Sequence, residues 1–342
     1  AATTFSIDTP LYVAGVVGAR GIDGNWEWWS FAVALVILLY IFARLWNRAQ
    51  VVTDNELSEL RYGGPPAAVL RGVKGFLYAV VLGSIGIGLA MLAMVKVVEA
   101  LELLPALGIE VGPGGRLWTV VGVGVFVLIY AGIAGLWGVV VTDFLQFVLG
   151  LFGAVVVAFY AVSDVGGLGA LVEQAGAWTD VDLLAFTPLE FNGGWIPRGW
   201  SAVAGISGTT FFAYVTLQWW AFRRSDGGGE FVQRLAAARS EEEAEKAAWL
   251  FNLLHYVIRT WPWVLVALAA VVIYPDLPDR EMGYPRLMLD FLPAGLLGLV
   301  VASLVAAFMS TVSTLINWSA SYLTSDVYAR FLRPHADDKE LV

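Results

Sequence analysis

A cluster of hydroxyl side chains interrupts an apolar stretch near the C-terminal end of the sequence. In VAAFMSTVSTLINWSASY, 305–322, the cluster consists of Ser310, Thr311, Ser313 and Thr314. Sodium is a hard cation that binds oxygen, and the hydroxyls of Ser310 and Thr311 can join the backbone carbonyl of Ala307, one helical turn earlier. Alternatively, the hydroxyls bond their own helix or a neighbouring helix. Spacing alone leaves both interpretations open.

Asp143 is the second candidate for chemistry. It stands in VTDFLQF, beside Thr142 and Gln146, near the start of the apolar segment 138–163. An acid inside a membrane-spanning segment is costly and can attract or relay a cation. Alternatively, it is a helix-start carboxylate favoured by the helix dipole.

His255 and Arg259 form a third candidate, because their i and i+4 spacing places them on one helical face that is expected to point inward. The sequence has only two histidines, the other being His335, so a histidine metal site is not expected. A hydrolase using Ser310 and His255 is conceivable, but the G-x-S-x-G motif is missing.

Two segments are typical of broken helices, whose exposed backbone groups bind ions and solutes in transporters. The first is TTFSIDTPLYVAG, 3–15, where Asp8 is expected to cap a half-helix or contact a ligand, with Thr9 beside it. The second is RRSDGGG, 223–229, which begins with Arg223 and has an ordinary loop as its alternative.

The composition favours a membrane protein. Of 342 residues, 58% are hydrophobic and 14% are charged, against about 45–50% and about 25% in soluble domains. The 15 Trp and 37 Gly agree, because Trp gathers at bilayer interfaces and Gly is frequent in spanning helices. The absence of Cys excludes a disulfide scaffold, and the net charge of −9 argues against a nucleic-acid partner.

Windows of about 20 apolar residues predict the spanning helices. A single transmembrane domain is expected over 1–342, with a half-span at 3–15 and spans at 28–46, 75–95, 117–135, 138–163, 200–222, 247–273 and 292–316. The run 117–163 is too long for one crossing and is expected to fold back near Gly132, Gly135 and Gly138.

The distribution of Lys and Arg predicts the orientation. Segments 44–74, 223–246 and 324–342 hold 13 of them, and the segments expected on the opposite side hold 6. Cationic loops stay in the cytoplasm, so the first group and the C-terminal end are expected to be cytoplasmic. Ser240 is expected to cap a helix that starts at SEEEAEKAAW.

Several long motifs resemble the sodium/solute symporters, the family of the sodium–glucose and sodium–proline cotransporters. The strongest is LLGLVVASLVAAFMSTVSTLINWSASYLTSDVYARFLRP, 296–334, which is similar to the signature helix of that family. Further resemblance comes, in the same order, from SIDTPLYVAG, LSELRYGGPPAAVLRGVKG, GLWGVVVTDFLQFVLGLFGAVV, GGGEFVQRLAAARSEEEAEKA and LPAGLLGLV.

The resemblance implies an all-α polytopic membrane protein with the leucine-transporter-like inverted repeat, here incomplete. The start of the first core helix and the last two core helices are expected to be missing. It implies a sodium site made by the carbonyls of Ala2, Phe5 and Ala307 and the hydroxyls of Ser310 and Thr311. Asp143 matches a family acid on the inner sodium path.

The implied activity is sodium-coupled symport of a small organic solute across the lipid bilayer by alternating access. The family's gating aromatic and sugar-binding amides fall where this chain has WWAFRRSDGGGEF, so a sugar is not the expected solute. Candidates for the solute cavity are Asp8, Thr9, Trp219, Trp220, Arg223 and His255.

Three other functions stay open at this point. A sensor built on a symporter-like fold would carry a signalling module beyond Val342. An intramembrane enzyme would need the Ser310 hydroxyl within hydrogen-bond reach of His255. A channel would need a continuous polar pore.

Overall fold

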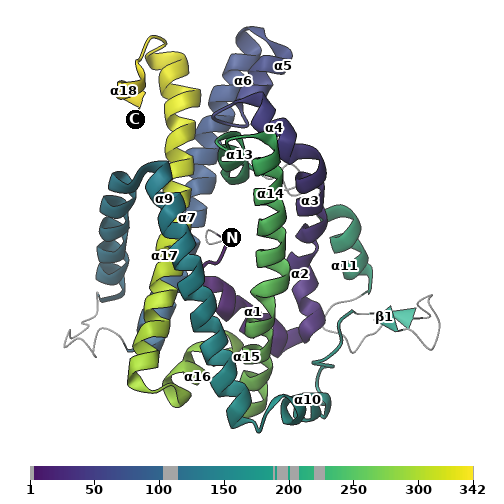
Figure 1. Ribbon diagram of the computed structural model, residues 1–342. Helices are drawn as coiled ribbons and strands as arrows, with labels where there is room; N and C mark the ends of the chain where they lie inside the picture. The colour runs from purple at the N-terminus through teal and green to yellow at the C-terminus, as the bar shows by residue number, and fades with distance from the viewer. Residues whose placement is uncertain are drawn as a thin grey trace.

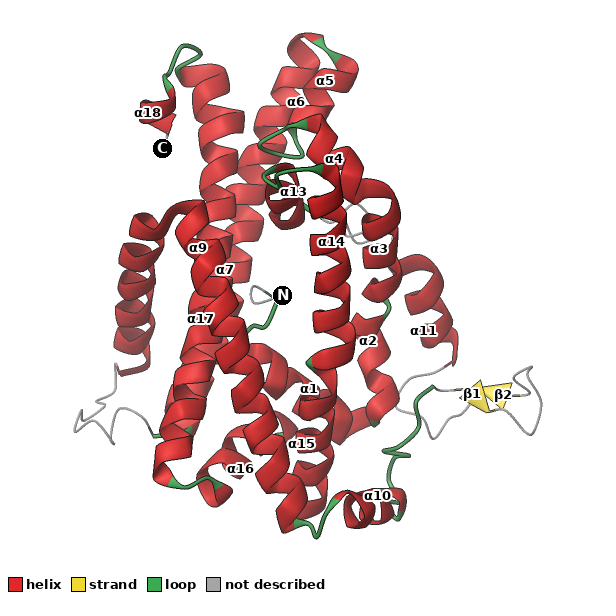
Figure 2. Ribbon diagram, in the orientation of Figure 1, coloured by secondary structure: helices red, strands yellow, loops and turns green. Residues whose placement is uncertain are grey.

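The computed structural model describes residues 4–102, 115–187, 189–190, 199–200, 208–218 and 228–341. These residues are almost all helical, apart from the two-residue strands β1 (Leu189–Glu190) and β2 (Gly199–Trp200), which pair antiparallel (Figure 1). Loops gather toward the two ends of the helices (Figure 2). This arrangement suits an apolar chain, because a helix satisfies its own backbone hydrogen bonds where water is absent.

Residues 4–100 form two short helices, Asp8–Arg20 and Glu56–Tyr62, and two long bent helices, Ile22–Ala49 and Gly64–Ala100. Their elements are α1 (Asp8–Arg20); η1 (Ile22–Asn25), α2 (Trp26–Trp29), α3 (Phe31–Ile37), η2 (Leu38–Phe42) and α4 (Ala43–Ala49); then α5 (Glu56–Tyr62), α6 (Gly64–Phe76), η3 (Leu77–Leu82) and α7 (Gly83–Ala100). Phe5 and Ile7, just before α1, are buried, so α1 begins inside the bundle.

The long apolar run forms α9 (Gly115–Asp164), which reverses direction. The Tyr130 hydroxyl donates to the Thr142 hydroxyl at 2.7 Å. A straight helix would separate residues twelve apart by about 18 Å along its axis. The run therefore folds back between these two residues, in the stretch that holds the predicted glycines, and Figure 1 shows its two arms side by side.

The second half of the chain continues with α10 (Leu168–Gly176), α11 (Gly208–Ala213), η4 (Tyr214–Gln218) and α13 (Gly229–Ala236). One rod follows from α14 (Glu241–Asn252), η5 (Leu253–Ile258) and α15 (Thr260–Ile273). After η6 (Arg280–Met282) and α16 (Gly283–Phe291), a last rod joins α17 (Ala294–Tyr322) to η7 (Leu323–Leu332), and α18 (Asp338–Leu341) ends the described chain.

Ser240 caps α14 as predicted. Its hydroxyl accepts a hydrogen bond from the Glu243 backbone N–H at 3.2 Å, and acidic residues fill the first turn of the helix. The serine thus satisfies one of the N–H groups that a helix start leaves without a backbone partner.

Within the described residues, five helices are long and apolar enough to cross a membrane. They are Ile22–Ala49, Gly64–Ala100, Gly138–Asp164, Glu241–Ile273 and Ala294–Leu332, with a shorter apolar helix at Trp118–Tyr130. Each contains or overlaps a predicted span but is longer, because hydropathy detects only the apolar part of a helix. The predicted half-span 3–15 becomes a helix at Asp8–Arg20. Of the predicted span 200–222, Trp200 and 208–218 are described, and Trp200 lies in strand β2.

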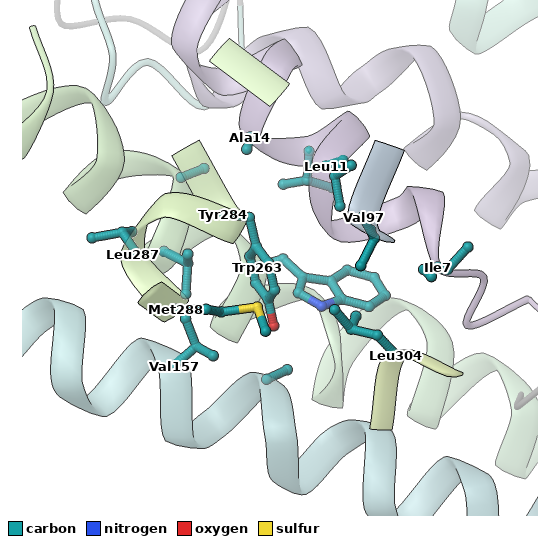
Figure 3. Packing of buried hydrophobic residues seen from close by; sticks show 14 of the residues in the cluster. Ile7, Leu11, Ala14, Val97, Val157, Trp263, Tyr284, Leu287, Met288 and Leu304 are labelled. Atoms are coloured by element: carbon teal, nitrogen blue, oxygen red, sulfur yellow. The ribbon is translucent and has the colours of Figure 1, made fainter. Parts of the chain in front are cut away.

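The main core joins the helices that surround α1. Trp263 on α15 is 1% exposed and lies among side chains from α1, α7, α16 and α17, including Leu11, Val97, Tyr284 and Leu304 (Figure 3). In sequence order α17 follows α9 by more than a hundred residues, yet the two helices lie against each other over much of their length. This pairing brings the hydroxyls of α17 to the acid of α9.

Candidate functional site

The hydroxyls of α17 make both local and interhelical hydrogen bonds. Ser310 is fully buried, and its hydroxyl donates to Asp143 Oδ1 at 2.5 Å. The Thr311 hydroxyl donates to the Ala307 carbonyl at 3.1 Å. Three of the predicted sodium ligands therefore lie within one turn of α17, and each oxygen keeps lone pairs after these hydrogen bonds.

Asp143 connects three elements. Its side chain is 12% exposed, and besides Ser310 it contacts Arg234 of α13, with 3.4 Å between Oδ2 and Nη2. The same guanidinium donates to the Thr314 hydroxyl at 2.8 Å and to the Glu230 carbonyl at 3.0 Å. Asp143 thus does more than favour a helix start, because its carboxylate binds side chains from two other helices.

Phe5 lies against the same helix as Asp143. Its ring is 3% exposed and packs on Phe147, at 6.1 Å between ring centroids. Gly150 provides the space, because a Cβ there would lie 2.9 Å from the Phe5 ring. Both α9 residues are within two turns of Asp143, so the stretch before α1 reaches the α9 side of the site. Ala2, its predicted companion, lies outside the described residues.

His255 and Arg259 share a face, as predicted, and contact each other at 3.2 Å between Nε2 and Nη2. The other ring nitrogen, Nδ1, lies 3.0 Å from the Thr4 hydroxyl. Since these contacts engage both ring nitrogens and the Ser310 hydroxyl donates to Asp143, the Ser310–His255 pair that an enzyme would need is not formed.

The prediction that Asp8 caps a half-helix is wrong. Asp8 is the first residue of α1, Ile7 occupies the cap position, and no side chain caps this helix. Asp8 is exposed and Thr9 is partly exposed. The remaining cavity candidates, Trp219, Trp220 and Arg223, lie outside the described residues.

Arg234 was missed by the sequence analysis. It belongs to the GGGEFVQRLAAARS motif, but nothing in that motif indicates a partner on α9. Packing decides its place: Gly229 lies so close to Trp318 and Tyr322 that a Cβ there would collide with both. The Gln233 amide also donates to Asn317 at 3.3 Å, so α13 is held on α17.

A second buried carboxylate, Asp326, was also missed. It is fully buried and accepts hydrogen bonds from Thr53 at 2.7 Å, Asn55 at 3.0 Å and Arg71 at 2.7 Å. The same Arg71 contacts Glu59 at 3.3 Å. This network ties the segment between α4 and α6 to η7.

Comparison with known proteins agrees with this arrangement. The model of the sodium:solute symporter family matches residues 1–342. A sodium/glucose cotransporter of Vibrio parahaemolyticus is 27% identical, and the match covers 93% of this chain and 57% of the relative. A sodium/mannose cotransporter of Bos taurus is 25% identical, with 92% and 53% covered. The chain thus spans about half the length of these relatives.

The fold is also similar to that of a solved structure. A Na⁺-coupled sialic acid symporter, in a substrate-bound outward-open state, matches with a TM-score of 0.74 at 19% identity, covering 99% of this chain and 67% of the other. This likeness confirms the predicted leucine-transporter-like helical fold. The matched family and relatives are transporters, not enzymes. With its apolar helices and a family match over its whole length, this chain is a multi-pass membrane protein of the sodium:solute symporter family.

Proposed function

We propose that this protein is a secondary active transporter that couples the entry of sodium to the uptake of a small organic solute. The relatives named for sodium-coupled transport of sugars support the coupling ion. The observation that carries the proposal is the meeting of Ser310 on α17 with Asp143 on α9, because it joins a carboxylate to hydroxyls inside an apolar bundle.

In this proposal sodium is bound by oxygens from two segments. The Phe5 carbonyl comes from the non-helical residues before α1, and Ala2, three positions earlier in the sequence, supplies the second carbonyl. The Ala307 carbonyl and the Ser310 and Thr311 hydroxyls come from α17. The donor set suits sodium, because hard cations take oxygen ligands. Asp143 attracts the cation to this site and lies on its path inward.

The solute cavity is proposed beside the sodium site, lined by Asp8, Thr9, Trp219, Trp220, Arg223 and His255. Sodium binding stabilises the outward-facing state and thereby completes the cavity. This linkage is reciprocal, so solute raises sodium affinity by the factor by which sodium raises solute affinity. An inside-negative potential adds about 2.3 kcal/mol per charge per 100 mV to the driving force.

We further propose that the protein lies in the cell membrane with the end that carries α5, α6 and η7 in the cytoplasm. This orientation follows from the 13 Lys and Arg residues on that side, which favour the cytoplasm. Lipid surrounds the many exposed apolar side chains of the spanning helices, among them Leu89, Phe126 and Phe144. No nucleic acid is expected as a partner of a chain with net charge −9.

The test is uptake into proteoliposomes that contain the full-length protein, with and without a sodium gradient, over a panel of candidate solutes. Ser310→Ala with Thr311→Val is expected to abolish sodium-dependent uptake with normal expression, because two ligand oxygens are removed. Ser321→Ala is the matched control, since its hydroxyl donates within its own helix, to the carbonyl of Trp318 at 2.7 Å.

Unchanged sodium dependence in the double variant would refute the proposed site. A sodium-dependent conformational change without accumulation of any solute would instead favour a membrane sensor built on this fold.

A further inference from the structure

Three residues in mutual contact, Thr4, His255 and Arg259, link the stretch before α1 to the continuous helix formed by α14, η5 and α15. Thr4 and His255 are 251 residues apart in sequence, with 3.0 Å between the Thr4 hydroxyl oxygen and Nδ1. The opposite nitrogen of the imidazole, Nε2, lies 3.2 Å from Arg259 Nη2. Arg259 is 1% exposed and His255 is 8% exposed, so their contact lies inside the protein.

The chemistry of the guanidinium fixes the direction of these hydrogen bonds. An arginine side chain only donates, so Nε2 of His255 must accept. An imidazole that accepts at Nε2 is neutral and carries its proton on Nδ1. That proton is then donated to the Thr4 hydroxyl oxygen. Arg259 therefore selects the Nδ1–H tautomer of His255, and His255 in turn holds Thr4.

Aromatic rings pack against His255 and Arg259. The imidazole stacks on Phe251 at 4.9 Å between centroids and meets Tyr256 edge-on at 4.4 Å. The Arg259 guanidinium lies 5.1 Å from the centre of the Trp263 ring. In such surroundings a lost hydrogen bond is costly, because no water replaces it.

Phe5, the next residue after Thr4, is held from other sides. Its ring lies 5.8 Å from the Arg259 guanidinium, 4.9 Å from Trp263 and 6.1 Å from Phe147 of α9. Arg259 therefore acts on both residues: on Thr4 through His255, and on the Phe5 ring directly. These contacts hold the two residues on either side of their shared peptide bond, next to the Phe5 carbonyl that is a proposed sodium ligand.

We propose that Arg259 and His255 are positioning residues that set sodium affinity by holding the Thr4–Phe5 backbone in its binding conformation. This role rests on the proposed sodium site and assigns to His255 a function that is separate from direct contact with the solute. A preorganised backbone binds its ion more tightly, because less ordering is left to occur on binding.

The first experiment reads the tautomer without any transport assay. The sequence has only His255 and His335, so histidine-selective ¹⁵N labelling gives two side-chain spectra, and His335→Gln assigns them. His255 is expected to show a protonated Nδ1 and an unprotonated Nε2. Arg259→Gln is expected to shift the ring toward the other tautomer. An Nε2–H tautomer in the unmodified protein would overturn the proposal.

The second experiment separates sodium affinity from turnover in proteoliposomes. His255→Leu is expected to raise the half-saturating sodium concentration about 3- to 10-fold, the effect of one lost hydrogen bond. His255→Asn should restore most of the affinity, since its amide can donate where Nδ1–H did. The matched control His335→Gln, in the exposed tail, should behave as the unmodified protein.

An unchanged sodium affinity in His255→Leu would contradict the positioning role, whatever happens to the maximal rate. Uptake by the unmodified protein that ignores sodium would refute the proposed function, and with it the effect on sodium affinity. The tautomer spectrum is independent of transport, so the two failures are distinguishable.

Discussion

Two buried carboxylates, Asp143 and Asp326, differ in their hydrogen-bond partners and in the length and exposure of their ion pairs. Asp326 is completely buried and accepts two neutral hydrogen bonds and a 2.7 Å contact from Arg71, whose side chain is 14% exposed. Asp143 accepts a hydroxyl, and its arginine lies at 3.4 Å with 27% of that side chain exposed. A close, dry ion pair is hard to separate, whereas a longer and wetter one exchanges easily.

The difference assigns a separate role to each carboxylate. Asp326 joins the segment between α4 and α6 to η7, so it stabilises one end of the bundle. Asp143 stands where a mobile cation can compete with Arg234 for the same carboxylate. Asp326 is suited to stabilising the fold, and Asp143 is suited to binding a passing cation. Three predictions test this contrast.

The largest expected effect concerns the pair of Arg71 and Asp326. Arg71→Gln leaves a buried carboxylate without its cation, which should lower the free energy of unfolding by about 3–5 kcal/mol. Replacing both residues, by Met and Leu, should recover most of that loss. Denaturant unfolding in detergent, followed by Trp fluorescence, measures both variants. A cost below about 1 kcal/mol for Arg71→Gln would show that the pair is no stronger than a surface salt bridge.

An intermediate effect is expected at the pair of Asp143 and Arg234, and the two substitutions should change sodium affinity in opposite directions. Asp143→Asn should raise the half-saturating sodium concentration of the full-length protein about 10-fold, equivalent to about 1.4 kcal/mol. Arg234→Gln should lower it about 2- to 5-fold, because a competing cation is removed. Sodium titrations of uptake measure both, and unfolding should change little. Shifts in the same direction would exclude competition between Arg234 and sodium.

The smallest effect is expected at Glu59, on the surface beside the Asp326 network. Hydrogen bonding to Arg330 holds the pKa of Glu59 below its usual value. The pair therefore stabilises the fold above the usual carboxyl pKa, and this contribution is lost as the pH falls through the lowered pKa. Arg330 is 41% exposed, so the loss should stay below about 1 kcal/mol.

Thermal unfolding of Glu59→Gln and the unmodified protein across this pH range measures the difference. Their midpoints should differ slightly at neutral pH and converge in acid. A gap that persists below the lowered pKa would show that the Glu59 carboxylate is not the source of the stabilisation.

The sequence determined the features that depend on neighbouring residues. Apolar runs predicted the helices, the length of one run predicted its reversal, and Ser240 predicted a helix start that the structure confirms. The i, i+4 spacing placed His255 and Arg259 on one face, where they are in contact. These properties follow from hydropathy, helical geometry and capping, all of which act within a few turns of the chain.

Only the tertiary structure decided which distant groups meet. Ser310 and Asp143 are 167 residues apart, and Thr4 and His255 are 251 residues apart. The partners of Arg234 and Asp326 also come from separate helices. A side chain's partner across a helix interface depends on how the helices rotate and pack, and that packing is a property of the whole bundle. Local sequence indicated which residues could do chemistry, and the packing of the helices decided which partners those residues meet.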